Sequence, residues 1–575
     1  MTRLNKITRY ISALVIMGLV SSCSGDWLDV NENPNNPIEP DLELLIPSIQ
    51  IATAQVLVDR LDDVGVLGQV IEGGNSDYDL GAVTSFGLGF EEFYVDALVN
   101  AERVIQDAPL NDPPLTTHSG IAKVMKAYVY SVIIDLWGNA PFDEALQGAE
   151  GPVAPLWEDG AQVYPKIIAL IDSGIADLNA GGVGPQSDPI YGGDASKWVK
   201  FANTLKLKMS LNTGDAGTAT AALAGGVIEA NADDADFVFG TGLAPENRHR
   251  MHQLHYTGGV KTFYMSNTMM FKMYKGYGVE GEADLVDPRM RYYFYRQLPS
   301  GTGAEPFTAA VAAGKVVPDD FPCFGFGARH TNPSTFTIRC SYGYVGDGYM
   351  GRDHGDGTGI PNDGGARTTF GIYPIGGLFD DNGGTTVQQG DISAGGIYPF
   401  LTNAMAKFMH AEAVLRLGVA GDAGALLEAG VRASISDVMA FGAGASNFNS
   451  SLAPTSADVE TYVEAVMARY DAAPDNDGVG SKLDVVMEQW YIASFGNNTE
   501  SYINFRRTKL PSVRPSTDAS GNDARMSILP VNTYPRRLPF PQTELQTNVN
   551  APDPDQIVWF TTPIFWDNVA YPTRF

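Results

Sequence analysis

Apolar residues recur every three or four positions in three stretches of the first half of the chain. These stretches cover residues 121–136, 163–178 and 198–209. The spacing places the apolar side chains on one side of a helix, so each stretch predicts a helix with one buried face. Asp194 stands just before the third stretch and is the expected N-cap of that helix.

The same periodicity returns near the C-terminus, in residues 404–415, 427–438, 459–470 and 483–490. The expected N-caps of the last three helices are Asp422, Ser456 and Ser481. Short connections join these helices in adjacent pairs, which indicates αα-hairpins stacked side by side. Hairpins of this size are similar to tetratricopeptide units of ~34 residues, although the strict consensus of that repeat does not occur.

The middle of the chain has a different composition. Residues 343–396 contain 17 glycines in 54 positions, and such a stretch cannot hold long helices. The prediction is therefore a mostly α fold. A single domain over residues 41–575 would have a helical scaffold at about 41–235 and 400–510, and a loop-rich insert with short strands at about 236–399.

The N-terminus reads as a secretory leader. Three basic residues precede an uncharged run from Tyr10 to Val20, which is too short to span a bilayer. The sequence Val20-Ser21-Ser22-Cys23 resembles a lipobox, after which the cysteine is acylated. Residues 1–22 are thus expected to be a lipoprotein signal peptide, and residues 23–40, polar and rich in Pro and Asn, an acylated tether.

The net charge of the chain argues against one class of partner, the nucleic acids. The chain has 38 basic and 67 acidic residues, a formal net charge of −29, and such a surface repels polyanions, so nucleic-acid binding is not expected. No second run of 18 apolar residues occurs. Membrane attachment is therefore expected through the lipid alone.

Common catalytic motifs do not occur in the sequence. It contains no G-x-x-x-x-G-K-[ST], G-x-S-x-G or H-E-x-x-H. A glycosidase needs only two carboxylates at the right separation. Because the chain has 67 acidic residues, the sequence does not exclude such a pair. His249, His252 and His255 have the spacing of a shared metal site on a helix. Flanking arginines and Gly258-Gly259 favour hydrogen-bonding surface histidines in a loop instead, and no cofactor is expected.

Two further features, a disulfide and a calcium site, each have an alternative interpretation. Cys323 and Cys340 can close a disulfide or remain as two free thiols. A Gly-rich segment offers oxygen ligands for Ca²⁺ from Asp347, Asp353 and Asp356, with Asp363 further on. The alternative is that these aspartates only stabilise turns by bonding their own backbone.

Several aromatic residues lie among polar and Gly-rich neighbours, where they can stack on a sugar or clamp a peptide. The alternative is that they fill small cores beneath loops. The candidate ligand site joins two segments, one after the first helix and one in the Gly-rich region. The nominated residues are Asn75, Asp77, Tyr78 and Phe86 from the first, and Tyr342, Tyr344 and Arg352 from the second.

Five motifs spread over most of the chain resemble those of the SusD/RagB family, in its second SusD-like branch. They are "DLWGNAPFDEAL" (135–146), "KWVKFANTLKLKMSL" (197–211), "HAEAVLRLG" (410–418), "QWYIASFGNNTESYINFRRTKLP" (489–511) and "PRRLPFPQTELQTN" (535–548). The paired arginines 506–507 and 536–537 lie in the last two motifs, where a guanidinium can tie carboxylates and carbonyls of packed elements together. We therefore expect them to be structural.

The resemblance implies a surface lipoprotein of the outer membrane that faces the cell exterior. It implies binding of an oligomeric nutrient and delivery to a SusC-like TonB-dependent β-barrel transporter. The ligand is an oligosaccharide or an oligopeptide, and we favour the oligosaccharide. The resemblance also implies that the protein breaks no bond and is not an enzyme. Two other hypotheses come from other classes: a surface carbohydrate-active hydrolase that uses an unrecognised carboxylate pair, and a purely structural helical adaptor.

The leader makes one prediction that can be tested in cells. Replacing Cys23 with Ala should release the protein from the membrane, because the acyl chains are its only expected anchor. Fractionation of cells without the transporter measures this directly. Continued membrane association of the Cys23→Ala variant in those cells would contradict the lipobox.

Overall fold

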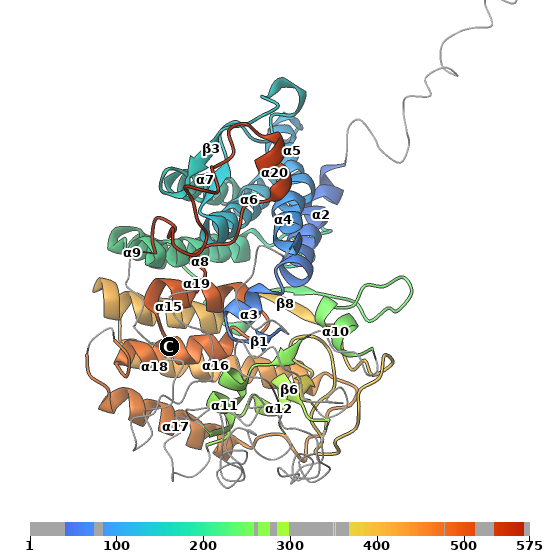
Figure 1. The fold of residues 1–575 in the computed structure, drawn as a ribbon, viewed down its shortest axis with the longest axis vertical. Coiled ribbons are helices and arrows are strands. Elements are labelled where there is room, and N and C mark those ends of the chain that lie inside the picture. The colour runs from blue at the N-terminus through green and yellow to red at the C-terminus, as the bar shows by residue number, and fades with distance from the viewer. Residues whose placement is uncertain are drawn as a thin grey trace, which may run out of the picture.

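Helices dominate the described part of the chain and pack largely as antiparallel neighbours (Figure 1). The computed structural model describes residues 41–73, 84–257, 263–275, 285–297, 349, 351, 367–475, 478–511 and 534–567. The prediction of a mostly α fold with a loop-rich region of short strands is confirmed.

The three apolar stripes of the first half form three successive helices, followed by a shorter one. These are α6 (Thr116–Trp137), α7 (Gly160–Ala180), α8 (Ala195–Thr213) and α9 (Ala216–Ala224), each in contact with the next. Asp194 caps α8 as predicted, because its carboxylate accepts hydrogen bonds from the backbone N–H groups of Ser196 and Lys197.

Two long helices run beside α6 at the N-terminal end of the described chain (Figure 1). The first is α2 (Leu42–Gln55), which continues as the π-helical turn η2 (Val56–Arg60). The second is α4 (Thr84–Glu92), continued by the π-helical turn η4 (Phe93–Leu98), α5 (Val99–Asp107) and the 3₁₀ turn η5 (Ala108–Leu110). Residues 42–60 are long and apolar enough to cross a membrane, but half of their most apolar window is buried in the protein, as in a core helix.

The four C-terminal stripes form four helices of a second group, which Figure 1 shows in its lower part. They are α15 (Asn403–Leu417), α16 (Ala423–Ala443), α17 (Ser456–Ala472) and α18 (Lys482–Ala493), and the group also contains α19 (Asn498–Thr508), which no stripe predicted. Asp422 and Ser481 are the N-caps of α16 and α18, as predicted. The cap of α17 is Thr455 rather than Ser456, because the Thr455 hydroxyl and Asp458 form a capping box.

The remaining described elements are short. The helical ones are α3 (Val64–Leu67), η6 (Gly148–Glu150), η7 (Asn231–Asp233), α10 (Arg250–His255), α11 (Asn267–Lys275), α12 (Met290–Tyr293) and α20 (Gln542–Thr547). Strands pair antiparallel in four two-stranded sheets: β1 (Ile71–Glu72) with β5 (Tyr264–Met265), β2 (Asn139–Pro141) with β3 (Trp157–Asp159), β4 (Ala235–Val238) with β8 (Ile397–Leu401), and β6 (Phe294–Tyr295) with β7 (Thr369–Phe370).

Buried apolar side chains form two cores. The larger core joins the helices of both halves, and includes Trp137, Trp198 and Trp490, all fully buried. The second core gathers short elements of the middle region around Tyr293 and Phe495, whose rings stack 4.4 Å apart. The middle region is therefore packed against the scaffold and has a hydrophobic core of its own.

The two C-terminal arginine pairs are built into the packing, as expected. The guanidinium of Arg506 is fully buried and donates to the carbonyls of Asp135 and Arg536 (2.9 Å to the latter). Arg507 pairs with the buried carboxylate of Glu412. Arg537 donates to the carbonyls of Trp137 (3.1 Å) and Pro563 (2.7 Å).

Replacing Arg506 with Ala should lower the free energy of unfolding by about 3 kcal/mol, because two buried carbonyls lose a charged donor. Urea denaturation measures the change. The matched control is Arg432→Ala, since the Arg432 side chain is 38% exposed and its partners Glu428 and Glu460 lie at the surface. Equal stability of the two variants would contradict a structural role for Arg506.

Three carboxyl groups with raised pKa values lie near the junction of β4 and α16. Burial, followed by repulsion from Asp437 and Asp236, raises the pKa of Asp234 to about 9. Burial likewise raises the pKa values of Asp236 and Asp437 above their ordinary range. The folded protein therefore retains protons that the unfolded chain releases at about pH 4.

The contribution of these three carboxyl groups to the stability of the protein should consequently fall as the pH rises from about 4 to about 9. In this window they bind more protons in the folded state than in the unfolded state, and each such proton changes the free energy of unfolding by about 1.4 kcal/mol per pH unit. Asp234→Asn should flatten this dependence and stabilise the protein relative to the parent at pH 8 more than at pH 5. A constant difference in stability across that range would contradict the shifted pKa.

Candidate ligand-binding site

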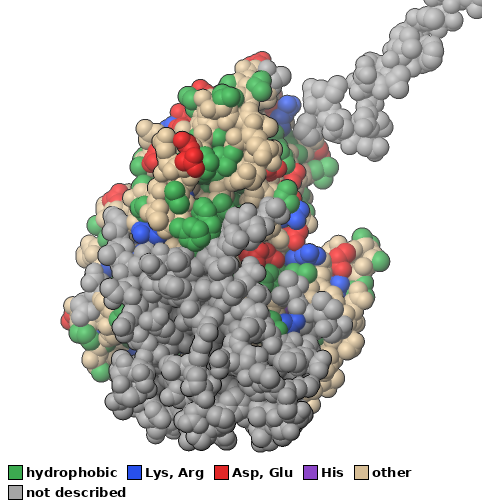
Figure 2. Space-filling model, viewed as in Figure 1, with side chains coloured by type: hydrophobic (Ala, Val, Ile, Leu, Met, Phe, Trp, Pro, Cys, Tyr) green, Lys and Arg blue, Asp and Glu red, His purple; other side chains and the backbone are tan. Residues whose placement is uncertain are grey.

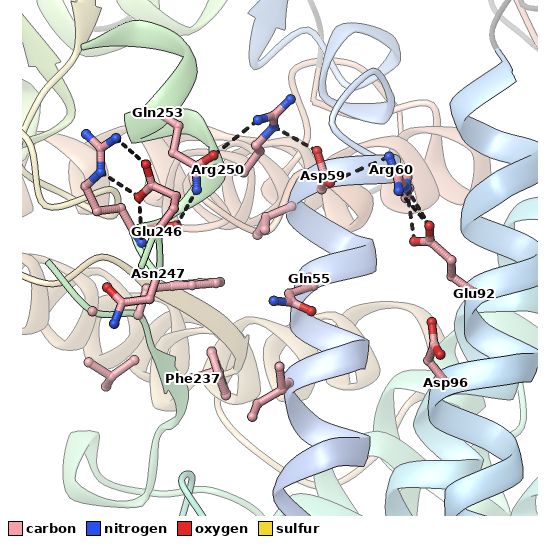
Figure 3. Close-up of a pocket in the computed structure, with 16 residues that line it drawn as sticks. Gln55, Asp59, Arg60, Glu92, Asp96, Phe237, Glu246, Asn247, Arg250 and Gln253 are labelled. Atoms are coloured by element: carbon pink, nitrogen blue, oxygen red, sulfur yellow. Dashed lines mark hydrogen bonds and ion pairs between the residues drawn. The ribbon is translucent and has the colours of Figure 1, made fainter. Parts of the chain in front are cut away.

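A cavity of about 580 Å³ lies where the first helices meet the start of the middle region. Figure 2 shows acidic and basic side chains meeting in a hollow between the upper and lower parts of the molecule, where Figure 1 places α10. The cavity is lined by residues of α2, η2, α4, η4, β4, α10 and the segment 239–248 (Figure 3).

Both π-helical turns face this cavity. Val58, Asp59 and Arg60 of η2 line it, as does Asp96 of η4. A π-helical turn widens a helix locally, and such turns are uncommon and occur frequently at functional sites. Because both π-helical turns lie at the same cavity, they support a binding site there independently of the composition of its lining.

The wall formed by the first helices carries fixed charges. Arg60 makes a bidentate interaction with Glu92, with distances of 2.9 Å from Nε and 2.6 Å from Nη2 to the same carboxylate oxygen, Oε1, and 3.0 Å from Nε to Oε2. The hydrogen bonds to Glu92 raise the pKa of Arg60, so this guanidinium stays charged. Asp59 reaches across the cavity to Arg250 of α10, 2.8 Å from its Nε (Figure 3).

The opposite wall is a tight loop that precedes α10. Backbone hydrogen bonds join Gly240 to Asn247 (2.9 Å) and Asn247 to Gly242 (3.2 Å). The side chain of Asn247 packs close to Gly240, where an added Cβ atom would lie 2.3 Å from its oxygen, and that oxygen accepts a hydrogen bond from the backbone N–H of Gly242 (2.7 Å). Arg248 makes two bonds to Glu246, of 2.8 and 2.6 Å, and these bonds hold the pKa of that carboxyl below its usual value.

Two phenylalanines provide the aromatic part of the lining, which also has the aliphatic side chains of Ile51, Val58 and Val238. Phe237 and Phe239 are two residues apart on extended backbone, so their side chains share one side, and their rings lie 5.1 Å apart. Phe237 is buried, while Phe239 is half-buried and also contacts the ring of His249. The site thus combines aromatic surface with hydrogen-bonding groups held at fixed positions.

Two sequence models of known families match the chain. The model described as "Starch-binding associating with outer membrane" matches residues 50–306, and the model described as "Susd and RagB outer membrane lipoprotein" matches residues 381–556. The chain belongs to the SusD/RagB family. Among curated proteins, none matches the chain at a significant level of sequence similarity.

Solved structures of SusD-like proteins share the fold over nearly the whole chain. A chitin-binding protein is 20% identical, with a TM-score of 0.61, and the match covers 92% of this chain and 100% of that one. A SusD/RagB family protein from Bacteroides thetaiotaomicron is 19% identical, with the same TM-score and coverage. A chitin-binding SusD homologue from Flavobacterium johnsoniae is 18% identical, with a TM-score of 0.57 and coverage of 92% and 99%.

Of the residues nominated from the sequence, only Phe86 lies in the described chain. It is fully buried in the larger core, on α4, and is therefore a packing residue rather than a platform for a ligand. Asn75, Asp77, Tyr78, Tyr342, Tyr344 and Arg352 lie outside the described residues, as do Cys23, Cys323, Cys340, Asp347, Asp353, Asp356 and Asp363.

The three histidines are placed differently from the expectation. His249 caps α10, and His252 and His255 lie in that helix rather than in a surface loop. All three are buried, and burial lowers the pKa of His249 to about 3 and that of His252 to about 4, so both are neutral. Within the described ranges, no three His, Cys, Asp or Glu residues are grouped so that they could hold a metal ion.

Sequence analysis missed the cavity although one signal was available. The stretch "PENRHRMHQ" (245–253) supplies Glu246, Arg248, Arg250 and Gln253 to the site. Interleaved charges of both signs are unusual before a buried helix, and they mark a surface that is fixed by ion pairs. Pairing of Arg60 with Glu92, 32 residues apart, depends on the packing of η2 against α4 and cannot be derived from spacing alone.

Proposed function

We propose that this SusD/RagB protein captures an oligosaccharide in the cavity between η2, η4 and α10, and delivers it to a SusC-like TonB-dependent β-barrel transporter. It does so as a lipoprotein on the outer face of the outer membrane. The membrane location follows the descriptions of the two matching families. The acyl anchor at Cys23 and the transporter follow from the lipobox and from the resemblance.

The observation that carries the proposal is the composition of the cavity lining. A sugar presents an apolar face to an aromatic ring, and hydroxyl groups to side chains that can donate or accept hydrogen bonds. Phe239 offers aromatic surface. Gln55 and Asp96 add polar groups to the lining (Figure 3). The ion pairs hold most of the other polar groups in place, which reduces the entropy lost on binding.

The similar structures support a glycan over a peptide. Two of them are described as chitin-binding, and one of the matching families as starch-binding. With identities of 18–20%, these proteins establish the fold alone, so the ligand of this chain is part of the proposal. Oligomers of N-acetylglucosamine and of glucose are the first probes to use.

Two of the lining carboxyl groups, those of Glu246 and Glu92, are unsuited to act as the general acid of a hydrolase. A glycosidase needs a general acid that is protonated near neutral pH, and hence a carboxyl with a raised pKa. Glu246 has the opposite shift because of Arg248. Glu92 is engaged by the two nitrogens of Arg60. A protein that binds and releases an unchanged oligosaccharide fits this arrangement.

Replacing Gln55 with Ala should weaken oligosaccharide binding about fivefold to tenfold, the effect of one hydrogen bond. Gln55 is exposed at the cavity, and no hydrogen bond of its side chain to a described residue is observed, so stability should be unchanged. Titration calorimetry with chitin and cello-oligosaccharides measures the affinity, and a reducing-end assay on the same mixtures measures turnover.

The matched control is Gln162→Ala. Gln162 is equally exposed, but it lies in the first turn of α7 and does not line the cavity. Its replacement should leave binding unchanged. Equal affinities for the parent and Gln55→Ala would place the ligand elsewhere, and new reducing ends would favour the hydrolase hypothesis.

A further inference from the structure

The cations that line the cavity are already paired. Arg60 is held by Glu92, Arg250 by Asp59, and Arg248 by Glu246. Two of these pairs are bidentate, and the side chain of Arg248 is only 3% exposed. Within the described lining, each guanidinium thus has a carboxylate partner before any ligand arrives.

One lining carboxylate is different. Asp96 lies on η4, about one helical turn beyond Glu92, and is exposed at the cavity (Figure 3). Across the residues that the structure describes, no Lys, Arg or His forms an ion pair with its carboxylate, and no side-chain hydrogen bond of Asp96 is observed; Asn100 donates to its backbone carbonyl instead. The described lining therefore has four carboxylates and three guanidiniums, and its net charge is negative.

This balance discriminates between ligands by charge. A uronate or sulfate group would have to displace a bidentate carboxylate from Arg60 or Arg248, compete with Asp59 for Arg250, or remain unpaired beside Asp96. Each of these is unfavourable. The net charge of the whole chain, −29, opposes the approach of an anion as well. A protonated amine on the sugar, in contrast, would find an unpaired carboxylate at Asp96.

We infer that the cavity selects uncharged and amine-bearing oligosaccharides over anionic ones, and that Asp96 determines the preference for the amine. The inference rests on the proposed function, because it concerns the same cavity. It assigns Asp96 the role of a specificity-determining residue that ranks ligands in the order cationic, neutral, anionic.

The test uses three β-1,4-linked pentasaccharides at pH 6 in low salt. They are the neutral N-acetylglucosamine pentamer, the cationic glucosamine pentamer and an anionic glucuronate pentamer. The glucosamine pentamer should bind about threefold more tightly than the neutral one, as expected for one partly exposed ion pair. This advantage should shrink at high ionic strength, and the glucuronate pentamer should bind at least tenfold more weakly than the neutral one.

Asp96→Asn should bring the ratio of the cationic and neutral dissociation constants to about one. The matched control is Glu464→Gln, which removes one exposed carboxylate on α17, away from the cavity lining, and should leave the ratio as in the parent. A ratio that persists in Asp96→Asn, or a glucuronate pentamer that binds as tightly as the neutral one, would overturn the inference while the glycan function stands. Failure of all three pentamers and of the cello-oligosaccharides to bind would overturn both.

Discussion

The carboxylate of Asp135 is the buried polar group on which the scaffold most depends. It lies on α6 with no exposure to solvent, and it accepts hydrogen bonds from Tyr164 on α7 (2.6 Å), Asn212 on α8 (3.1 Å) and Trp566 near the C-terminus (2.9 Å). Burial raises its pKa, and these donors, together with Lys208, oppose that rise. An unpaired carboxylate at this depth would cost several kcal/mol, so the four segments are fixed relative to one another.

The positions of the two cavity walls depend on the helices that are held together around Asp135. Arg506 on α19 donates to the backbone carbonyl of Asp135, and α19 packs in turn against α3, which directly follows η2 with its Asp59 and Arg60. The opposite wall begins at β4, which pairs with β8, and β8 leads directly into the scaffold helix α15. Both walls therefore extend from one rigid helical body, and the Asp59–Arg250 pair joins them across the gap.

The sequence was most informative where local physics decides the structure. Apolar periodicity identified α6, α7, α8 and the helices α15 to α18, but not α19. The side-chain caps Asp194, Asp422 and Ser481 were correct because a cap is a contact within one turn. The ligand site depends on contacts between distant segments. Phe86, which has glycines nearby in the sequence, is a core residue. The exposure of a side chain depends on what packs against it in the fold and not on its neighbours in the sequence. The ion-paired cavity needed the positions of α2, η4 and α10 together.

The central claim is that the cavity between η2, η4 and α10 holds the ligand, and a crystal structure of the protein with a bound N-acetylglucosamine or cello-oligosaccharide tests it most directly. The account predicts electron density for sugar rings against Phe239, with hydroxyl groups within hydrogen-bonding distance of Gln55. Density for the oligosaccharide only outside this cavity, with Gln55 and Asp96 still facing solvent, would contradict it.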